Sequence, residues 1–404
     1  MKTLIHTMYY LPEFGSAPIL MDELASSLSS MGHEVEVITT IPRPPHHKPY
    51  KGKLYVREKG DGFLVKRIRT NYTVHHIGRL IAWTIYTLFT IFNLRTVKRG
   101  DILFLRLPPL QLGVMGAIAK KLRKSKIILN VQDIHPDLSI QSGLLKNPTL
   151  IKWALAFEKW IYDQSENILV ISEGFKKNLT DKGVEPDKVK IIPNWVDTEF
   201  LKPMPKDNHL SSKLGISEKF VVMYSGTISI SSNLTLQNVL ETAKNLQANE
   251  DILFVIVGEG LKKSELEEKA RNLDLKNVRF LPFQPYEELP ALLASSDVLL
   301  VPLDREKSLL SVPSKLYNFM AAGRPILGLA QPESEVKLLI EDTGCGLCVP
   351  PEDIEDIAQA VLSLKQDTEG RRKMAENSRK YALDNYSRAK VMDDLDGMIR
   401  SLSQ

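Results

Sequence analysis

Lys315 stands in the first turn of a short segment in which both ends of a helix are marked, SVPSKLYNFMAAGRP at residues 311–325. Ser311 or Ser314 can cap the N-terminus, Pro313 fits the first turn, and a Gly and a Pro end the helix. A helix N-terminus binds anions, because its free N–H groups and the positive end of its dipole face the ligand. A lysine there opposes the dipole, so Lys315 is either a solvated surface residue or part of an anion site.

A glycine turn after an apolar run, YSGT, supplies the second half of such an anion site. Gly226 has no Cβ, so the backbone N–H groups around it, including that of Thr227, can approach a phosphate closely. A lysine and backbone N–H groups together form a diphosphate clamp. Asn318 lies one helical turn after Lys315 and would reach a ribose hydroxyl or simply face solvent.

Polar residues also follow the other apolar runs that are typical of strands. Ligands of open α/β sheets bind at the carboxyl ends of the strands, so these positions are further candidates. Two such edges facing one cleft would hold a two-part substrate between them. The candidates are Gly15, Ser16, Arg106, Gln132, Asp133 and His135 in the first half, and Glu259, Pro282, Phe283 and Ser314 in the second.

The elements that would position these residues follow a strand–helix rhythm in both halves of the chain. Each half opens with a βαβ unit, and helices without a following strand end the chain. The predicted strands are residues 2–8, 34–40, 64–68, 101–105, 126–131, 167–171, 189–192, 220–224, 252–257, 278–281, 298–301 and 326–329. The predicted helices are residues 19–31, 77–94, 112–122, 148–162, 234–246, 261–272, 354–364, 371–385 and 388–402.

This order predicts an α/β protein with two doubly wound, Rossmann-like domains. We expect the first at residues 1–200, the second at 201–385, and a C-terminal helix at 386–404 that returns to the first domain. Residues 202–208 are expected to link the domains, and residues 42–59 to form a proline- and lysine-rich loop.

Charge is distributed unevenly along the 404 residues. Residues 1–200 hold 28 Lys and Arg against 19 Asp and Glu, whereas the remainder holds 25 against 30. A basic half suits nucleic acid, an anionic membrane or a phosphorylated substrate. Nucleic acid is disfavoured, because the basic stretch lacks interleaved aromatic residues and any recognisable motif.

Cysteines and the N-terminus exclude several classes of protein. Cys345 and Cys348 form a lone C-x2-C without further ligands nearby, so neither a zinc site nor a redox pair is expected. No signal-peptide pattern opens the chain, which predicts a cytoplasmic protein. No motif requires a cofactor, and Mg²⁺ is allowed but implied by none.

One predicted helix is apolar nearly all round. Its apolar centre, residues 80–92, has only 13 residues, whereas about 20 are needed to span a bilayer. It is either a buried core helix or a helix dipped into a membrane surface, anchored by Trp83 and Tyr86 and flanked by Arg79 and Arg95.

A series of motifs, in this order and spacing, resembles the retaining GT4 family of glycosyltransferases with the GT-B fold. The resemblance covers nearly the whole chain, and it is strongest to the bacterial branch that builds capsule, O-antigen and colanic-acid-type polysaccharides. The motifs are MYYLPEFGSAP, MGHEVEVIT, NVQDIHPD, LVISEGFKKNL, IIPNWVD, YSGT, VGEG, VRFLPFQPYEELPALLASSDVLLVPL and PSKLYNFMAAGRPIL.

The resemblance implies a nucleotide-sugar donor held mainly by the second domain, an acceptor on the first, and retention at the anomeric carbon. Lys315 and the amides of residues 226–227 would stabilise the leaving diphosphate. The loop around Gly15 and Ser16 would approach the diphosphate and the acceptor, and the backbone of residues 282–284 would contact the base.

The chain departs from the family pattern at several of these positions. Leu310 and Asn318 replace two glutamates of many members, so the usual sugar contact is lost while a ribose contact survives through Asn318. Gln132 replaces a histidine that faces the anomeric centre, with Asp133 and His135 as adjacent alternatives and His135 equally a structural residue. The donor sugar stays open, with a loose fit to amino or deoxy hexoses.

Three classes of function remain. A transferase would move sugar from a UDP-linked donor to a lipid-diphosphate-linked saccharide at the inner face of the plasma membrane, with Arg106 on the acceptor side. This reading explains the basic first domain together with the apolar helix. A GT-B-type sugar-nucleotide epimerase would need no acceptor, and a non-catalytic nucleotide-sugar binder would fit the missing glutamates.

Overall fold

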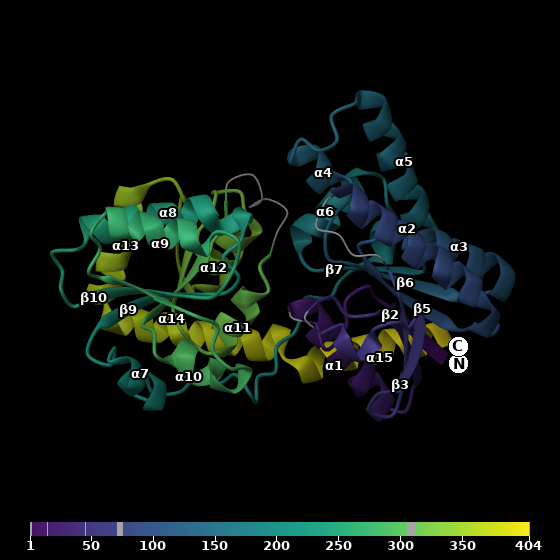
Figure 1. The fold of residues 1–404 in the computed structure, drawn as a ribbon, viewed down its shortest axis with the longest axis horizontal. Helices are drawn as coiled ribbons and strands as arrows, with labels where there is room; N and C mark the ends of the chain where they lie inside the picture. Colours follow the sequence, from purple (N-terminus) through teal and green to yellow (C-terminus); the bar gives the residue numbers. More distant parts are fainter. Residues whose placement is uncertain (1, 14, 45, 71–75, 305–311, 404) are drawn as a thin grey trace. The chain divides into compact units, whose positions relative to one another are not determined.

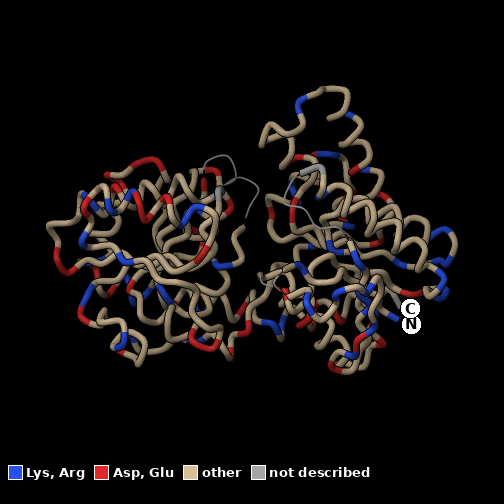
Figure 2. The backbone as a smooth tube through the Cα atoms, in the orientation of Figure 1, with Lys and Arg blue, Asp and Glu red and all other residues tan. Residues whose placement is uncertain are grey.

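The chain divides into two compact units in the computed structural model. Unit 1 comprises Met1–Pro193 with Ala389–Gln404, and unit 2 comprises Asn194–Arg388. All residues are described except 1, 14, 45, 71–75, 305–311 and 404. Each unit is a mainly parallel sheet with helices on both faces, which confirms the predicted α/β class (Figure 1). Acidic positions are interspersed among basic ones in both units (Figure 2).

The sheet of unit 1 runs in the order β3-β4-β2-β1-β5-β6-β7-β8. Its central strands are buried on both faces, as in β5, where every residue is buried, and this explains their continuous apolar runs. Helices α2, α3 and α5 lie along one side of the sheet, while α1 and α15 lie together on the other (Figure 1). The strands are β1 (Lys2–His6), β2 (Glu34–Thr40), β3 (Tyr55–Lys59), β4 (Leu64–Ile68), β5 (Ile102–Leu107), β6 (Lys126–Val131), β7 (Asn167–Val170) and β8 (Val189–Ile191). The helices are α1 (Ser16–Ser30), α2 (His76–Phe92), α3 (Leu112–Arg123), α4 (Asp137–Gln141), α5 (Pro148–Gln164), α6 (Glu173–Asp181) and α15 (Arg388–Ser403).

The sheet of unit 2 runs in the order β11-β10-β9-β12-β13-β14, with every pairing parallel. Two apolar layers cover it, one formed with α8, α9 and α13 and the other with α7, α10, α11 and α12. The strands are β9 (Phe220–Ser225), β10 (Ile252–Val257), β11 (Val278–Leu281), β12 (Val298–Pro302), β13 (Ile326–Leu329) and β14 (Gly346–Val349). The helices are α7 (His209–Leu214), α8 (Ile230–Asn245), α9 (Lys263–Asn272), α10 (Leu289–Ala294), α11 (Lys315–Ala321), α12 (Glu335–Thr343), α13 (Ile354–Gln366) and α14 (Thr368–Tyr381).

Both edge strands that the sequence did not predict are short. β3 lies within the predicted loop at residues 42–59 and pairs antiparallel with β4. It is charged and half exposed, as sheet edges commonly are, so its pattern resembles a loop. β14 contains the second cysteine of the C-x2-C pair, and a Cβ on Gly346 would lie 1.9 Å from the carbonyl oxygen of Ile326 in β13. Glycine therefore lets this strand approach its neighbour.

The predicted helix at residues 311–325 is shorter than expected, because α11 begins at Lys315. Ser314 precedes it with helical backbone angles (φ −58°, ψ −25°) and makes no capping hydrogen bond, so the predicted cap at Ser314 is wrong. A capping side chain needs an extended backbone to reach back to the first N–H groups. Ser311 lies outside the described residues.

The C-terminal helix α15 packs in unit 1, although the residues before it belong to unit 2. Nε2 of His33 lies 2.5 Å from Oδ1 of Asp396, and Arg400 donates to the carbonyl oxygen of Met31 at 3.0 Å. Both contacts join α15 to the turn between α1 and β2.

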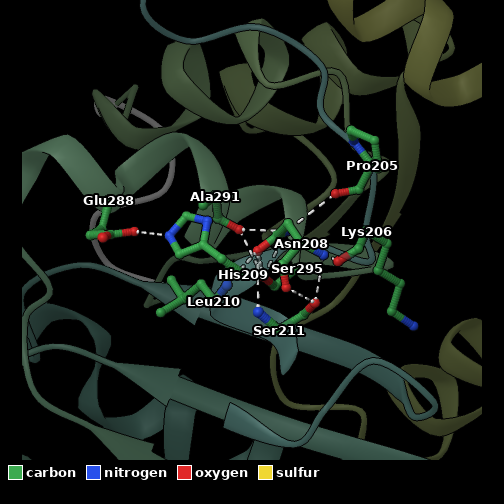
Figure 3. Close-up of polar contacts among 9 residues, drawn as sticks. All are labelled: Pro205, Lys206, Asn208, His209, Leu210, Ser211, Glu288, Ala291 and Ser295. Carbon is green, nitrogen blue, oxygen red and sulfur yellow. Dashed lines mark hydrogen bonds and ion pairs between the residues drawn. The ribbon is translucent and has the colours of Figure 1, made fainter. Parts of the chain in front are cut away.

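The segment that leads into α7 is held by Asn208 (Figure 3). Its Oδ1 accepts from the N–H groups of Leu210 and Ser211 at 2.9 and 3.2 Å, which caps α7. Its Nδ2 donates to the carbonyl oxygen of Ala291 in α10 at 3.2 Å and to Oγ of Ser295 at 3.2 Å. One amide thus satisfies the helix N-terminus and joins two helices of the same layer.

We predict that Asn208→Ala lowers the free energy of unfolding by about 1–2 kcal/mol, because it removes both the cap and the donor to α10. Asn208→Ser keeps an oxygen that can cap the helix and loses the amide donor without placing a charge beside the carbonyl oxygens that accept from it, so it should cost less. Urea unfolding followed by far-UV circular dichroism measures both variants. An equal loss in the two would show that the cap contributes nothing.

Candidate functional site

Lys315 and Gly226 meet at the carboxyl end of the sheet in unit 2. A Cβ built on Gly226 would lie 2.7 Å from Nζ of Lys315, so the glycine leaves the space that the ammonium group occupies. Nζ also lies 3.9 Å from the centroid of the Tyr224 ring, within cation–π distance. Among the described residues, none forms a hydrogen bond or an ion pair with this ammonium group.

Burial lowers the pKa of Lys315 to about 7. The cause is the loss of water around the ammonium group on burial, with no counter-charge supplied by the residues that the structure describes. The side chain remains half-buried rather than sealed, so an anion can reach it. A bound anion would raise the pKa of Lys315 again, because its negative charge stabilises the ammonium form.

The glycine turns after β9 and β10 pack backbone against backbone. A Cβ on Gly258 would lie 2.0 Å from the carbonyl oxygen of Gly226, and one on Gly260 would lie 2.1 Å from that of Ile228. The N–H of Gly226 donates to the carbonyl oxygen of Val257 at 3.0 Å, so it is not available to a phosphate. The N–H of Thr227 has no partner among the described residues and is the available donor of the pair.

The other predicted donor residues lie around this turn. Phe283 is 51% exposed, and its Cε1 lies 3.6 Å from the Cβ position of Gly258, so it offers an open ring face beside the glycines. Pro282 before it is exposed. Asn318 is half-buried, one turn after Lys315. Oε1 of Glu259 pairs with Nζ of Lys263 at 2.7 Å.

The sequence did not identify Tyr224 as part of this site, and the predicted site residue Leu310 is not among the described residues. Tyr224 was read only as a strand residue, yet its ring supports the Lys315 ammonium group and its hydroxyl donates to the carbonyl oxygen of Thr227 at 2.7 Å. Its position at the carboxyl end of β9 was the available signal. Leu310 lies outside the described residues.

In unit 1, a charged cluster gathers at the carboxyl ends of β5 and β6. Arg106 is only 8% exposed, and its Nε has no hydrogen-bond partner among the described residues. Burial lowers the pKa of Arg106 to about 10, against the opposing charges of Asp133 and Tyr9. Burial likewise raises the pKa of Asp133, while Arg106 and Arg79 oppose that shift. Asp133 as a residue is nonetheless exposed to solvent.

His135 and Gln132 flank this cluster in different ways. Burial, and then the charge of Arg79, lower the pKa of His135, so its ring is neutral at pH 7. The ring lies edge-on to Trp83 at 5.8 Å between centroids, and its Nδ1 is 3.4 Å from Oγ of Ser139. Nε2 of Gln132 donates to Oδ1 of Asn130 at 2.8 Å.

The loop after β1 carries Gly15 and Ser16 at the start of α1. Gly15 has φ +122°, a conformation that side chains rarely adopt. Its Cβ position is nearly open, with only Pro18 within 4 Å, so backbone conformation rather than crowding favours glycine there. Ser16 is exposed.

Two predicted membrane anchors are buried instead. The Tyr86 hydroxyl donates to the carbonyl oxygen of Ile38 at 2.7 Å, and its side chain is fully buried, while Trp83 is 8% exposed. Both lie on the face of α2 that packs on the sheet. The sequence did not show this, because the helix carries apolar residues on more than one face. Arg79 and Arg95 are exposed, as predicted.

The described part of the chain contains neither a metal-binding group of side chains nor a helix that could span a membrane. No three His, Cys, Asp or Glu side chains there converge into a set that could hold a metal ion. None of the described helices has both the length and the hydropathy needed to cross a membrane.

Comparisons with known proteins agree with this architecture. Residues 19–195 match the glycosyl transferase 4-like domain, and residues 207–381 match the glycosyl transferases group 1. The chain is 30% identical over 392 residues to WcaI of Escherichia coli (strain K12), whose name assigns it to glycosyl transfer in colanic acid biosynthesis, covering 92% of this chain and 95% of WcaI. It is 26% identical to WbjE of Pseudomonas aeruginosa, named as a glycosyltransferase, over 68% of each chain.

Among solved structures, HepE of Anabaena in complex with UDP has a TM-score of 0.76 at 16% identity, covering 99% of this chain and 100% of HepE. This likeness extends over the whole fold, and the family matches cover both halves of the sequence. The protein is therefore a glycosyltransferase of group 1, with a GT4-like first domain and the two Rossmann-like units of the GT-B fold.

Proposed function

We propose that the protein is a retaining glycosyltransferase that moves a hexose, of the amino or deoxy type, from a UDP-linked donor to a lipid-diphosphate-linked saccharide in cell-surface polysaccharide synthesis. The observation that carries the donor half is Lys315, a half-buried ammonium group with no anionic partner among the described residues, set against a glycine turn. The names of WcaI and the UDP complex of HepE support the same reading.

A nucleoside diphosphate fits the groups around that turn. Its phosphates would meet the Lys315 ammonium group and the N–H of Thr227, and its ribose would lie toward Asn318. The open face of Phe283 suits the base. This binding would supply a counter-charge to a cation that has none among the described residues.

In the transfer step, negative charge develops on the diphosphate as the bond between it and the anomeric carbon of the donor sugar breaks. Lys315 and the N–H of Thr227 are fixed before the reaction, so they stabilise this charge without reorganising. The Tyr224 ring holds the ammonium group in place from the other side. In unit 1, the Arg106, Asp133 and His135 cluster would position the acceptor hydroxyl.

The lipid-linked acceptor is supported by two exposed apolar stripes in unit 1. On α2, exposed apolar side chains follow one another along the helix. On α5, a second stripe includes two exposed tryptophans, one of which stacks on Phe157 at 6.1 Å. Tryptophan beside exposed basic residues is typical of membrane-surface helices. The stripes comprise Leu80, Ile81, Ile85, Leu88 and Phe92 on α2 and Leu150, Trp153 and Trp160 on α5, with Arg95, Lys98, Arg99, Lys146 and Lys152 as the exposed basic residues beside them.

We expect Lys315→Ala to weaken UDP binding by about 10- to 100-fold, because it removes one charge-assisted hydrogen bond from the diphosphate. Transfer should fall by about 10²–10³ in kcat/KM. Calorimetry with UDP, and assays with a panel of UDP-, GDP- and TDP-sugars with and without a short lipid-diphosphate sugar, measure the two effects. Turnover of a nucleotide sugar without acceptor would favour the epimerase instead.

The matched control is Lys365→Ala, which removes a lysine paired with Asp251 at the amino end of β10, the opposite edge of the same sheet. It should leave UDP affinity unchanged. Full UDP affinity and full activity in Lys315→Ala would contradict the diphosphate assignment.

The affinity for UDP should fall as pH rises from 7 to 9. The pKa of Lys315 is lowered to about 7 in the free protein and would be raised in the complex. Below pH 7 the ammonium group is already present, whereas above it binding must take up a proton, at a cost of up to tenfold per pH unit. Tyr224, whose pKa burial raises to about 12, stays neutral throughout.

Lys315→Arg keeps its charge over this whole pH range, so it should bind UDP with an affinity that is flat from pH 7 to 9. Calorimetric titrations at several pH values compare the two proteins. An equal slope in both would assign the pH dependence to another group.

Leu88→Asp should reduce co-sedimentation with anionic phospholipid vesicles, because it places a charge in the exposed stripe of α2. Leu338→Asp on α12 is the matched control, since Leu338 is 49% exposed and Leu88 is 50% exposed. Recovery of the unmodified protein in the supernatant, with anionic and neutral vesicles alike, would count against membrane association.

A further inference from the structure

Unit 1 contains a cavity of about 520 Å³ that the transfer chemistry described above leaves unused. It lies where β1, β2 and β4 end and α2 begins, so several loops from the carboxyl edge of the sheet form its walls. Its volume suits a small polar ligand such as one or two sugar rings. The residues that the argument uses are Tyr9, Glu13, Arg43, His47, Arg69 and Arg79.

Glu13 presents an unused acceptor to this cavity. The side chain is 5% exposed, and its Oε1 accepts from the backbone N–H and the Nε of Arg43 at 2.9 and 3.0 Å. Its Oε2 is buried without a hydrogen-bond partner among the described residues, and so is Nδ1 of His47 on the same wall. Buried polar atoms are rarely left unpaired, so these two indicate a ligand that supplies hydroxyl groups.

The charge of the lining is positive despite this carboxylate. Arg43, Arg69 and Arg79 all line the cavity. Glu13 forms an ion pair with Arg43, and the charge of Arg79 also acts on Asp133. The Arg69 guanidinium is exposed and makes no ion pair or hydrogen bond with any residue that the structure describes. The Arg79 guanidinium lies over Trp83, 5.5 Å from the ring centroid, at the start of α2. An anionic group would therefore be drawn to the wall that these two arginines form.

Most of the remaining lining is apolar or aromatic, which suits the faces of a sugar ring. Tyr9 lies under the Arg43 guanidinium at 4.8 Å, and Trp83 closes the side next to α2. The cavity thus combines a hydroxyl acceptor, a cationic wall and flat apolar surfaces within one recess.

We propose that this cavity binds the acceptor through an anionic sugar, with a phosphate or carboxylate on Arg69 and Arg79 and a ring hydroxyl on Oε2 of Glu13. The inference rests on the proposed transfer to a lipid-linked saccharide and adds where the acceptor binds and that it is charged. Because Arg79 opens α2, the acceptor's anionic end would lie next to the exposed stripe of that helix.

Binding of three soluble probes to the full chain, with UDP at saturation, tests this assignment. Glucose 1-phosphate carries a phosphate, glucuronic acid carries a carboxylate, and glucose carries neither. We expect at least one anionic probe to bind tenfold or more tightly than glucose, with an affinity that salt weakens. The tighter of the two anions identifies the charged group of the acceptor.

Arg69→Ala should weaken the preferred anionic probe about tenfold without changing the affinity for UDP. Arg57→Ala is the control, because Arg57 is an equally exposed arginine on β3 outside the cavity lining. Glu13→Gln, which replaces one oxygen acceptor by a donor, should weaken the probe while retaining its preference for the anion. Equal binding of glucose and both anions, displacement of the probe by UDP, or an unchanged affinity in Arg69→Ala would overturn the inference.

The test separates this inference from the proposed function, since no donor sugar is consumed. Probe binding that Arg69→Ala weakens supports the cavity assignment even if no transfer is found with any donor. Transfer to an acceptor that proceeds equally well in Arg69→Ala overturns the cavity assignment and leaves the proposed function intact.

Discussion

The donor site that we propose depends on one constraint, the close approach of two glycine turns at the carboxyl ends of β9 and β10. With a Cβ position on Gly258 only 2.0 Å from the Gly226 carbonyl oxygen, no larger residue fits without moving backbone. This contact sets where the Thr227 N–H points and leaves room above Gly226 for the Lys315 ammonium group. The exposed ring of Phe283 lies against the same turn. Contacts between main-chain atoms thus position the anion-binding groups, without the need for several polar side chains.

This arrangement leaves a half-buried ammonium group without a counter-charge from any residue that the structure describes, and burial lowers the pKa of Lys315 to about 7. An ion pair with a protein carboxylate would have removed this penalty and would also have competed with a ligand diphosphate. The aromatic ring of Tyr224 stabilises the cation without offering it a charge. The Lys315 ammonium group is therefore held in position and remains available to a bound anion, as pre-organised electrostatic catalysis requires.

Unit 1, on which we propose that the acceptor binds, places its loops beside a helix with apolar residues on two faces. Tyr86 and Trp83 anchor α2 to the sheet, the former through a hydrogen bond to the Ile38 carbonyl oxygen. With this face of α2 packed on the sheet, the aliphatic stripe that includes Leu88 is exposed and Arg79 lines the cavity. A single helix orientation thus decides both the membrane-facing surface that we propose and one wall of the acceptor cavity.

The sequence by itself determined the α/β class, most strands and helices, the family, and the pairing of Lys315 with the glycine turn, since apolar runs, turn residues and motif order are local properties. Only the tertiary structure decided which face of α2 is buried, because apolar residues on both faces erase the periodicity that would show it. The tertiary structure alone also revealed edge strands β3 and β14, the role of Tyr224, and the Oε2 of Glu13 that has no partner among the described residues. Each depends on a neighbour distant in sequence, and no local pattern encodes such a partner.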